Sequence, residues 1–301
     1  MIEKRVLSSD GKHELSGVVY VPSGAPKAIF QVVHGMAEHI SRYEAFMQTM
    51  AEQGYVCFGY DHLGHGETAL DESELGYIAP ADGWNHLVKD VSLFASAVRE
   101  EYGLSLPYYL LGHSMGSFIV RLVALQNQPD KLIIMGTGGP NPASGAGLAM
   151  IGMNRFFKGE RHCPKSMAWM MFGSYNKRFK DEKDEFSWLS KDVTIRDEYR
   201  NDPKCGFLFS NSALKDLMYL LRNCNAPDWF QNFPSTLPTL LMSGEDDPVG
   251  DYTKGVRYVY EHLQAAGANV GLRLYPGCRH EILNDTCREQ VIKDILEFFE
   301  K

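Results

Sequence analysis

One stretch decides the fold: Tyr108-Tyr-Leu-Leu-Gly-His-Ser-Met-Gly-Ser-Phe-Ile-Val120. The apolar run that begins it is typical of a buried strand, and the segment that follows Gly112-His-Ser-Met-Gly116 has helical spacing. G-x-S-x-G fits a sharp strand-to-helix turn, because small residues at both ends permit the strained backbone that exposes a serine hydroxyl. The pentapeptide alone is a weak signal that chance can supply. Its place between a predicted strand and a predicted helix makes Ser114 a candidate nucleophile.

The same alternation of strand and helix continues on both sides of this stretch. Asp10-Gly11 predicts a turn that joins the first two strands as an antiparallel hairpin. The later apolar runs alternate with amphipathic segments, which indicates an α/β fold with a mostly parallel, doubly wound sheet and helices on both faces. The predicted strands are 5–9, 14–21, 28–33, 56–60, 108–111, 131–135, 239–242 and 270–275, and the predicted helices are 43–53, 84–102, 114–126, 252–266 and one ending at 299.

A helical insertion interrupts the predicted α/β domain. Between Pro140 and about Asn225 the sequence has helical but no strand periodicity. We therefore expect an α/β core in residues 1–138 and 228–301, and a helical cap in residues 139–227. The cap carries flexible and aromatic side chains that suit either an acyl chain or the packed side of the cap: Met150, Met153, Met167, Met170, Met171, Phe156, Phe157, Trp169 and Phe172.

Composition and charge narrow the classes of partner. The 301 residues include 44% hydrophobic and 23% charged residues, as in ordinary globular proteins. The net charge of -8 and the scattered Lys and Arg argue against nucleic acid or an anionic lipid surface. A small, neutral molecule is the expected partner. The sequence does not determine the oligomeric state.

The N-terminal residues suggest a cytoplasmic protein, and a reducing compartment would keep its cysteines as thiols. Met1-Ile-Glu-Lys-Arg lacks the apolar core of a signal peptide, and glycines and prolines interrupt the uncharged run 132–154, so no stable membrane insertion is expected. The six cysteines include no CxxC pair, so we expect free thiols, with neither a disulfide nor a zinc site. Cys278 receives no role, and no cofactor or metal is predicted.

A serine nucleophile needs a histidine base and a carboxylate that orients it. In this type of fold the chain order is serine, acid, histidine, which leaves His162, His262 and His280. His162 lies in the cap and His262 in a predicted helix, whereas His280 follows the last strand, at a sheet edge where catalytic loops gather. His280 is therefore the predicted base.

The acid is expected in the loop after strand 239–242. Glu245, Asp246 and Asp247 all lie there. Pro248 restricts Asp247 to an extended conformation that would fix its side-chain direction, so Asp247 is favoured and Asp246 is the alternative.

Backbone N–H groups must also stabilise the oxyanion of the tetrahedral intermediate. The residue after the nucleophile, Met115, supplies one candidate, and Met36 in the loop His34-Gly35-Met36 supplies the other. Asp61-His-Leu-Gly-His-Gly66 follows the next strand. Its spacing matches no metal-ligand pattern, so we interpret it as a brace for the neighbouring loops.

Five motifs in this order resemble the monoacylglycerol lipase and lysophospholipase-like branch of the α/β-hydrolases (S33-type, Hydrolase_4): His34-Gly-Met-Ala-Glu-His39, Asp61–Gly66, Gly112–Gly116, Gly244-Glu-Asp-Asp-Pro248 and His280-Glu281. The resemblance implies an eight-stranded sheet, a helical cap, the triad Ser114, Asp247 and His280, and an oxyanion hole at Met36 and Met115. It also implies that Glu38 and Arg42 bind a glycerol head group, with His113 as a further candidate. Leu283 stands where some monoacylglycerol lipases carry a polar histidine.

The expected function is a serine carboxylic-ester hydrolase that acts on monoacylglycerol, lysophospholipid or similar acyl esters. A proline-iminopeptidase-like serine aminopeptidase is the main alternative, and it would need cap carboxylates for the substrate amine; the candidates are Glu160, Asp181, Glu182, Asp184 and Glu185. A non-catalytic binding protein of the same fold would predict a broken triad. Dehalogenase and epoxide-hydrolase relatives carry Asp at the position of Ser114, which disfavours that chemistry.

Overall fold

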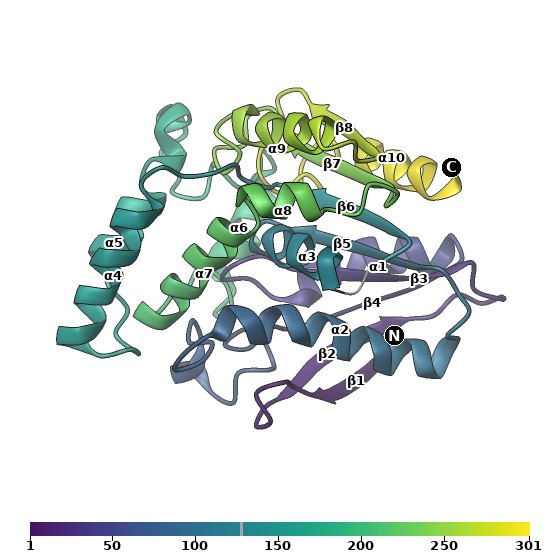
Figure 1. Cartoon of the computed structure of the whole chain (residues 1–301), viewed down its shortest axis with the longest axis horizontal. Helices are drawn as coiled ribbons and strands as arrows, with labels where there is room; N and C mark the ends of the chain where they lie inside the picture. The colour runs from purple at the N-terminus through teal and green to yellow at the C-terminus, as the bar shows by residue number, and fades with distance from the viewer. Residues whose placement is uncertain (127–128) are drawn as a thin grey trace.

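An eight-stranded sheet in the order β1-β2-β4-β3-β5-β6-β7-β8 forms the centre of the computed structural model, which describes residues 1–126 and 129–301 (Figure 1). β2 runs antiparallel to both of its neighbours, and the remaining pairings are parallel. The predicted α/β fold with an eight-stranded sheet is confirmed. The strands are β1 (Ile2–Leu7), β2 (Glu14–Tyr20), β3 (Ala28–Val33), β4 (Tyr55–Tyr60), β5 (Tyr108–His113), β6 (Lys131–Met135), β7 (Thr239–Gly244) and β8 (Val270–Tyr275).

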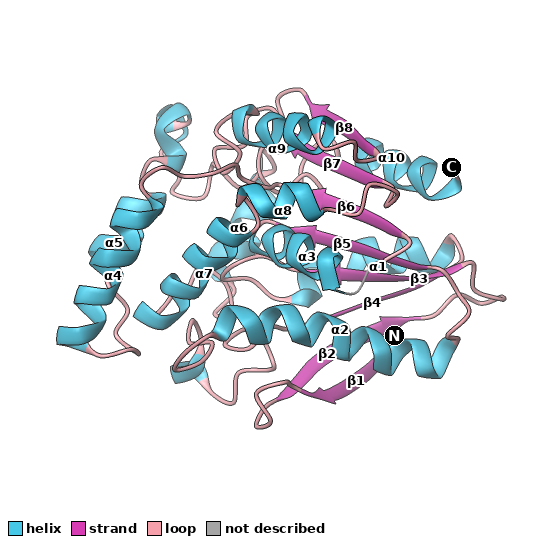
Figure 2. Ribbon diagram, viewed as in Figure 1, coloured by secondary structure: helices cyan, strands magenta, loops and turns pink. Residues whose placement is uncertain are grey.

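Helices cover both faces of the sheet (Figure 2). One hydrophobic cluster joins α2 (Gly83–Tyr102), α3 (Met115–Gln126) and α9 (Lys254–Ala265) to one face. A second cluster joins α1 (Glu44–Glu52) and α10 (Arg288–Glu300) to the other face. The short 3-10 helices η1 (Ile40–Tyr43) and η2 (Glu72–Glu74) lie in loops after β3 and β4.

The chain between β6 and β7 is helical wherever it forms regular structure. It contains α4 (Ser144–Lys158), α5 (Lys165–Phe172), η3 (Tyr175–Arg178), η4 (Lys180–Glu182), α6 (Val193–Asn201), α7 (Asn211–Asn223) and α8 (Pro227–Asn232). Figure 1 shows α4 and α5 projecting from the side of the molecule at the left. The division into core 1–138, cap 139–227 and core 228–301 remains a prediction.

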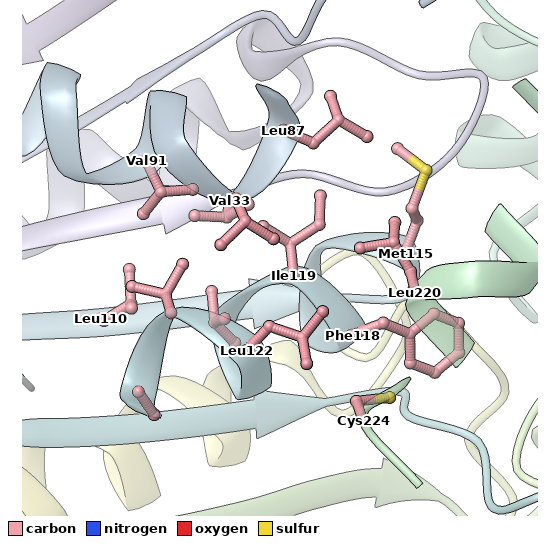
Figure 3. Packing of buried hydrophobic residues seen from close by; sticks show 14 of the residues in the cluster. Val33, Leu87, Val91, Leu110, Met115, Phe118, Ile119, Leu122, Leu220 and Cys224 are labelled. Carbon is pink, nitrogen blue, oxygen red and sulfur yellow. The ribbon is translucent and has the colours of Figure 1, made fainter. Parts of the chain in front are cut away.

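The parallel strands are buried at every position in β3, β4, β5 and β7. Helices on both faces exclude water from both sets of side chains, so these strands are mostly apolar and show no alternation of buried and exposed positions. In Figure 3, α3 presents Ile119 and Leu122 to the core, and Val33 lies close to Ile119. The helix that carries the end of the predicted serine turn is thus held firmly against the sheet.

The first hairpin differs from the prediction. β1 covers Ile2–Leu7, not 5–9, and pairs in register from Ile2↔Val19 to Leu7↔Glu14. The connection is a loop of residues 8–13, because the Asp10 carboxylate accepts hydrogen bonds from the N–H groups of Lys12 (2.8 Å) and His13 (3.0 Å). An Asx-type turn at Asp10 therefore ends the strand earlier than the apolar pattern suggests.

The expectation of free thiols throughout is wrong for two of the cysteines. Cys278 and Cys287 form a disulfide, with their Cα atoms 6.6 Å apart. The loop between β8 and α10 folds back on itself and brings the two residues together across a separation of nine positions. CxxC spacing is therefore not required for pairing here.

The apolar side chains of the predicted cap divide into two groups. Met167 is buried, and Met171 and Phe172 pack against the core cluster, as expected for side chains that face the core. The others are exposed: Met150, Met153, Phe156, Phe157, Trp169 and Met170, with Phe156 83% exposed. Contact of any of them with an acyl chain remains a prediction.

Among the described residues, no helix combines the length and the apolar character that crossing a membrane requires.

Asp216 on α7 is a buried carboxylate that should make stability depend on pH. Burial, reinforced by the charge of Asp82, raises its pKa to about 7. The folded chain therefore holds a proton that the unfolded chain loses near pH 4, so stability falls as pH rises from about 4 to 7. In urea unfolding, wild type should gain about 2 kcal/mol at pH 5 relative to pH 8 from this group, and Asp216→Asn should lack that gain. Exposed Asp228→Asn is the control; equal pH dependence in Asp216→Asn and wild type would contradict the prediction.

Candidate active site

Ser114 lies at a strained turn between β5 and α3. Its φ of +54° is a left-handed conformation that non-glycine residues rarely adopt. A Cβ at Gly112 would lie 2.3 Å from the Gly116 carbonyl oxygen, and a Cβ at Gly116 would lie 2.1 Å from that of Val33. Both glycines are therefore required for the turn. The expected strand, turn and helix are present, and Ser114 is only partly buried.

Asp247 and His280 form a buried pair. His280 Nδ1 lies 2.9 Å from Asp247 Oδ2, and Asp247 Oδ1 accepts a hydrogen bond from the Val249 N–H at 2.8 Å. The carboxylate fixes the tautomer with the proton on Nδ1. In the described part of the chain, His280 Nε2 is buried without a hydrogen-bond partner. This nitrogen is free to accept a proton.

The structure brings Asp247, and not Asp246, to His280. The Asp246 N–H donates to the Cys278 carbonyl at 3.0 Å, and the residue is half-buried. His262 is exposed on α9, where Nδ1 bonds the Tyr258 carbonyl and the ring stacks on Tyr258 at 3.8 Å. His162 lies between α4 and α5.

The loop after β3 approaches the serine closely. A Cβ at Gly35 would lie 2.9 Å from the Ser114 Cβ. Glu38 Oε1 holds this loop by accepting a hydrogen bond from the Gly35 N–H at 2.6 Å. Within residues 1–126 and 129–301, no backbone hydrogen bond engages the N–H of Met36 or of Met115. Both predicted donors are thus available beside the serine turn.

Three buried histidines brace the same loop. The His62 backbone N–H donates to His34 Nε2 at 3.1 Å, His62 Nε2 donates to the His34 carbonyl at 3.2 Å, and the Ala37 N–H donates to His65 Nε2 at 3.3 Å. The rings of His34 and His65 must be neutral, because their Nε2 atoms accept hydrogen bonds. The interpretation of 61–66 as a brace agrees with these contacts.

The three rings predict a loss of stability in acid. Burial lowers the pKa of His62 to about 3 and of His65 to about 4, and lowers that of His34 well below its usual value. The unfolded chain binds these protons below about pH 6.5 and the folded chain does not, so stability is lost as pH falls from 6.5 toward 4.

The expected loss is about 2 kcal/mol each for His62 and His65 at pH 5 relative to pH 7.5, measured by urea unfolding. His65→Gln should lose about 2 kcal/mol less than wild type over that interval, whereas exposed His262→Gln should behave as wild type. An unchanged pH dependence in His65→Gln would refute the assignment.

The predicted head-group residues bind one another. Arg42 contacts Glu38 Oε2 at 2.7 Å and forms a bidentate ion pair with Glu281 at 2.7 and 2.6 Å. His113 Nδ1 lies 3.3 Å from Glu38 Oε1 and 2.7 Å from the Tyr43 hydroxyl, and its Nε2 lies 3.2 Å from the His280 carbonyl. Contact of Glu38, Arg42 and His113 with a substrate remains a prediction.

Charge compensation stabilises this network. Burial would raise the pKa of Glu38, but the hydrogen bond of His113 and the Arg42 charge outweigh it and hold that pKa well below normal. Burial would lower the pKa of His113, and Glu38 outweighs it in turn and raises that pKa. The sequence analysis did not identify Tyr43 as part of the site, or Glu281 as the partner of Arg42. The only sequence signal for Glu281 was its position directly after His280.

His39, Asp202 and Cys205 have side-chain ligand atoms within 4.8 Å of one another. His39 Nε2 already bonds Asp202 Oδ2 at 2.7 Å, which accounts for their approach. Burial raises the pKa of the Cys205 thiol and outweighs the Arg42 charge, which lowers it. A protonated thiol beside a cation is a poor metal ligand, so we assign no metal to this group.

The sheet order and the serine at the turn after β5 define the class of α/β-hydrolases. The family model Hydrolase_4, described as serine aminopeptidase S33, matches residues 24–287. The chain belongs to this family.

Relatives and solved structures specify the branch. Human monoglyceride lipase is 27% identical over 278 residues, covering 91% of this chain and 82% of that protein. A thermostable carboxyl esterase from Bacillus coagulans in complex with glycerol has a TM-score of 0.92 at 30% identity, covering 99% and 97%. A soluble variant of the Saccharomyces cerevisiae monoglyceride lipase shares the fold, with a TM-score of 0.75 at 20% identity and coverage of 95% and 91%. The resemblance to the monoacylglycerol lipase-like branch is confirmed, and the chain is a hydrolase of the lipase or esterase type.

Proposed function

We propose that this hydrolase is a serine carboxylic-ester hydrolase that cleaves monoacylglycerol, lysophospholipid or similar acyl esters through an acyl-enzyme. The observation that carries the proposal is the unpartnered Nε2 of His280, whose other ring nitrogen is fixed by Asp247 at 2.9 Å. A histidine held in this way is prepared to take the proton of Ser114.

The chemistry follows from these positions. His280 Nε2 takes the proton from Ser114 Oγ as the oxygen attacks the ester carbonyl, and the N–H groups of Met36 and Met115 stabilise the oxyanion. The imidazolium then gives its proton to the leaving alcohol oxygen, which leaves the acyl group on Ser114. Water, deprotonated by His280, attacks the acyl-enzyme, releases the carboxylic acid and restores the serine.

A glycerol ester is the favoured substrate. The relatives named monoglyceride lipase and the esterase described with glycerol support this choice. In this chain, Glu38, Arg42 and Glu281 form a polar cluster that is connected to the His280 backbone through His113. Contact of a glycerol head group with this cluster would require the substrate to replace part of the Arg42 pairing with Glu38 or Glu281.

The aminopeptidase alternative is favoured by the name of the family model, whereas three of its five candidate carboxylates are already paired. Glu160 bonds Arg155 and Tyr77, and Glu182 and Asp184 bind arginines, while Asp181 and Glu185 are exposed. Carboxylates occupied by arginine are poor sites for a substrate amine.

A comparison of esters with an amide tests the proposal. We expect kcat/KM for 1-monoacylglycerols and lysophospholipids of graded acyl length to exceed that for proline-β-naphthylamide by at least about 100-fold. Ser114→Ala supplies the blank for each substrate. Preference for the prolyl amide would establish the aminopeptidase alternative. A folded protein that hydrolyses none of these substrates and does not react with a fluorophosphonate probe would indicate a binding protein.

A further inference from the structure

One segment of the chain between β6 and β7 lies along the loop that carries the proposed base. We name residues 182–191 the strap and residues 276–285 the histidine loop. The Glu281 N–H donates to the Leu189 carbonyl at 2.8 Å, and the His280 N–H donates to the Trp188 carbonyl at 3.4 Å. The backbone of His280 is therefore held directly by the strap.

Arg279 locks the strap onto the histidine loop. Its Nη1 donates to the carbonyls of Ser187 at 2.5 Å and Ser190 at 3.3 Å, and to Glu182 Oε2 at 3.0 Å, while Nη2 bonds Glu182 Oε1. Arg279 is 5% exposed. The bidentate geometry fixes the guanidinium in one orientation, immediately before His280 in the chain.

The Glu182 carboxylate is ionised over the working pH range. The hydrogen bond from Arg279 outweighs partial burial and lowers the pKa of Glu182 to about 2, and Arg196 adds to the effect. Arg196 also donates to the Ser187 hydroxyl at 2.9 Å. Glu182 thus joins α6 and the histidine loop through charge-assisted bonds.

Asp285 closes the other end of the contact. Its Oδ2 accepts a hydrogen bond from the Arg279 N–H at 2.8 Å, and its Oδ1 accepts one from the Lys191 N–H at 3.0 Å. Asp285 is fully buried. One carboxylate therefore ties the end of the strap to the histidine loop.

The strap also contacts the ring of the proposed base. The Trp188 ring lies 5.2 Å from the His280 ring, and the Tyr175 ring lies 5.0 Å from that of Trp188. Two sets of contacts therefore fix the His280 side chain. Asp247 holds Nδ1, and the strap holds the backbone of His280 and contacts its ring.

We propose that Glu182 and Arg279 are positioning residues that use the strap to set the orientation of His280 toward Ser114. This inference rests on the proposed function, in which His280 is the base. The strap is then part of the catalytic framework. It stays on the core even if the projecting helices α4 and α5 move. A displacement of the base by about 1 Å can cost about 100-fold in rate, so loosening the strap should act on the chemical step.

The test compares Glu182→Gln with Glu185→Gln, an exposed carboxylate of the same strap. For Glu182→Gln we expect kcat to fall about 10- to 100-fold for both p-nitrophenyl acetate and p-nitrophenyl laurate, with KM changed less than about twofold. Glu185→Gln should match wild type. A loss confined to laurate, or a change in KM alone, would show a substrate-binding role and overturn the proposal.

Two further measurements separate positioning from stability. The low-field proton resonance of His280 Nδ1–H should broaden or shift in folded Glu182→Gln and remain unchanged in Glu185→Gln. Arg279→Lys should retain more activity than Arg279→Gln. If Glu182→Gln does not fold, this pair of variants tests the positioning role instead. Wild-type kcat and an unchanged resonance in the folded variants would refute the positioning role.

His280→Ala in the same assays distinguishes failure of this inference from failure of the proposed function. If His280→Ala remains active, the proposed function is wrong. If His280→Ala is inactive while the Glu182 and Arg279 variants behave as wild type, only the positioning role falls.

Discussion

Replacement of Ser114 by alanine is expected to lower kcat/KM for p-nitrophenyl butyrate by at least about 10⁴-fold. The hydroxyl at this turn is the only group in the proposed mechanism that can form the acyl-enzyme, and its φ of +54° presents it beside Gly35. Initial rates at equal protein concentration measure the effect, with circular dichroism to confirm the fold. Exposed Ser105→Ala is the matched control.

Labelling supplies an independent measurement of the same prediction. A fluorophosphonate probe should add one group to wild type and to Ser105→Ala, and none to Ser114→Ala, by intact mass. Peptide mapping should place the group on Ser114. Retained hydrolysis in Ser114→Ala, or a label on another residue, would show that the nucleophile lies elsewhere.

Asp247→Asn is expected to lower kcat by about 10³- to 10⁴-fold while the protein stays folded. Asparagine can donate a hydrogen bond to Nδ1 of His280, which would place the ring proton on Nε2 and remove the acceptor that Ser114 needs. Steady-state kinetics with p-nitrophenyl butyrate measure the loss, and KM should change little.

Asp246→Asn is the matched control for this variant. Asp246 precedes Asp247 directly, but its backbone N–H is committed to the Cys278 carbonyl and its carboxylate has no contact with His280 among the hydrogen bonds of the described chain. We expect Asp246→Asn to retain activity within about twofold. The reverse outcome, with Asp246→Asn inactive and Asp247→Asn active, would reassign the acid.

Local sequence predicted the features that depend on neighbouring residues. Gly112 and Gly116 identify the turn at Ser114 because each lies where a Cβ would meet backbone at 2.1–2.3 Å. Pro248 identifies Asp247 because a proline restricts the backbone of the residue that precedes it. The buried parallel strands appear as mostly apolar runs, so their positions along the chain could be inferred from the sequence.

Contacts between distant residues were not predictable in this way. Arg42 and Glu281 are 239 positions apart, and Glu182 and Arg279 are 97 apart. Nothing in the sequence pairs one charged residue with another over such distances. The disulfide between Cys278 and Cys287 was missed for a related reason, since it depends on how the histidine loop folds back.

The sequence by itself determined the α/β-hydrolase fold, the position of Ser114 at its turn and the chain order of the candidate acid and base. These depend on local backbone sterics and on which side chains avoid water. The tertiary structure decided that Asp247 reaches His280, that Glu38, Arg42 and His113 bind one another, and that the strap holds the histidine loop. Those outcomes depend on the directions in which side chains from separate elements meet, and that geometry exists only once the chain has folded.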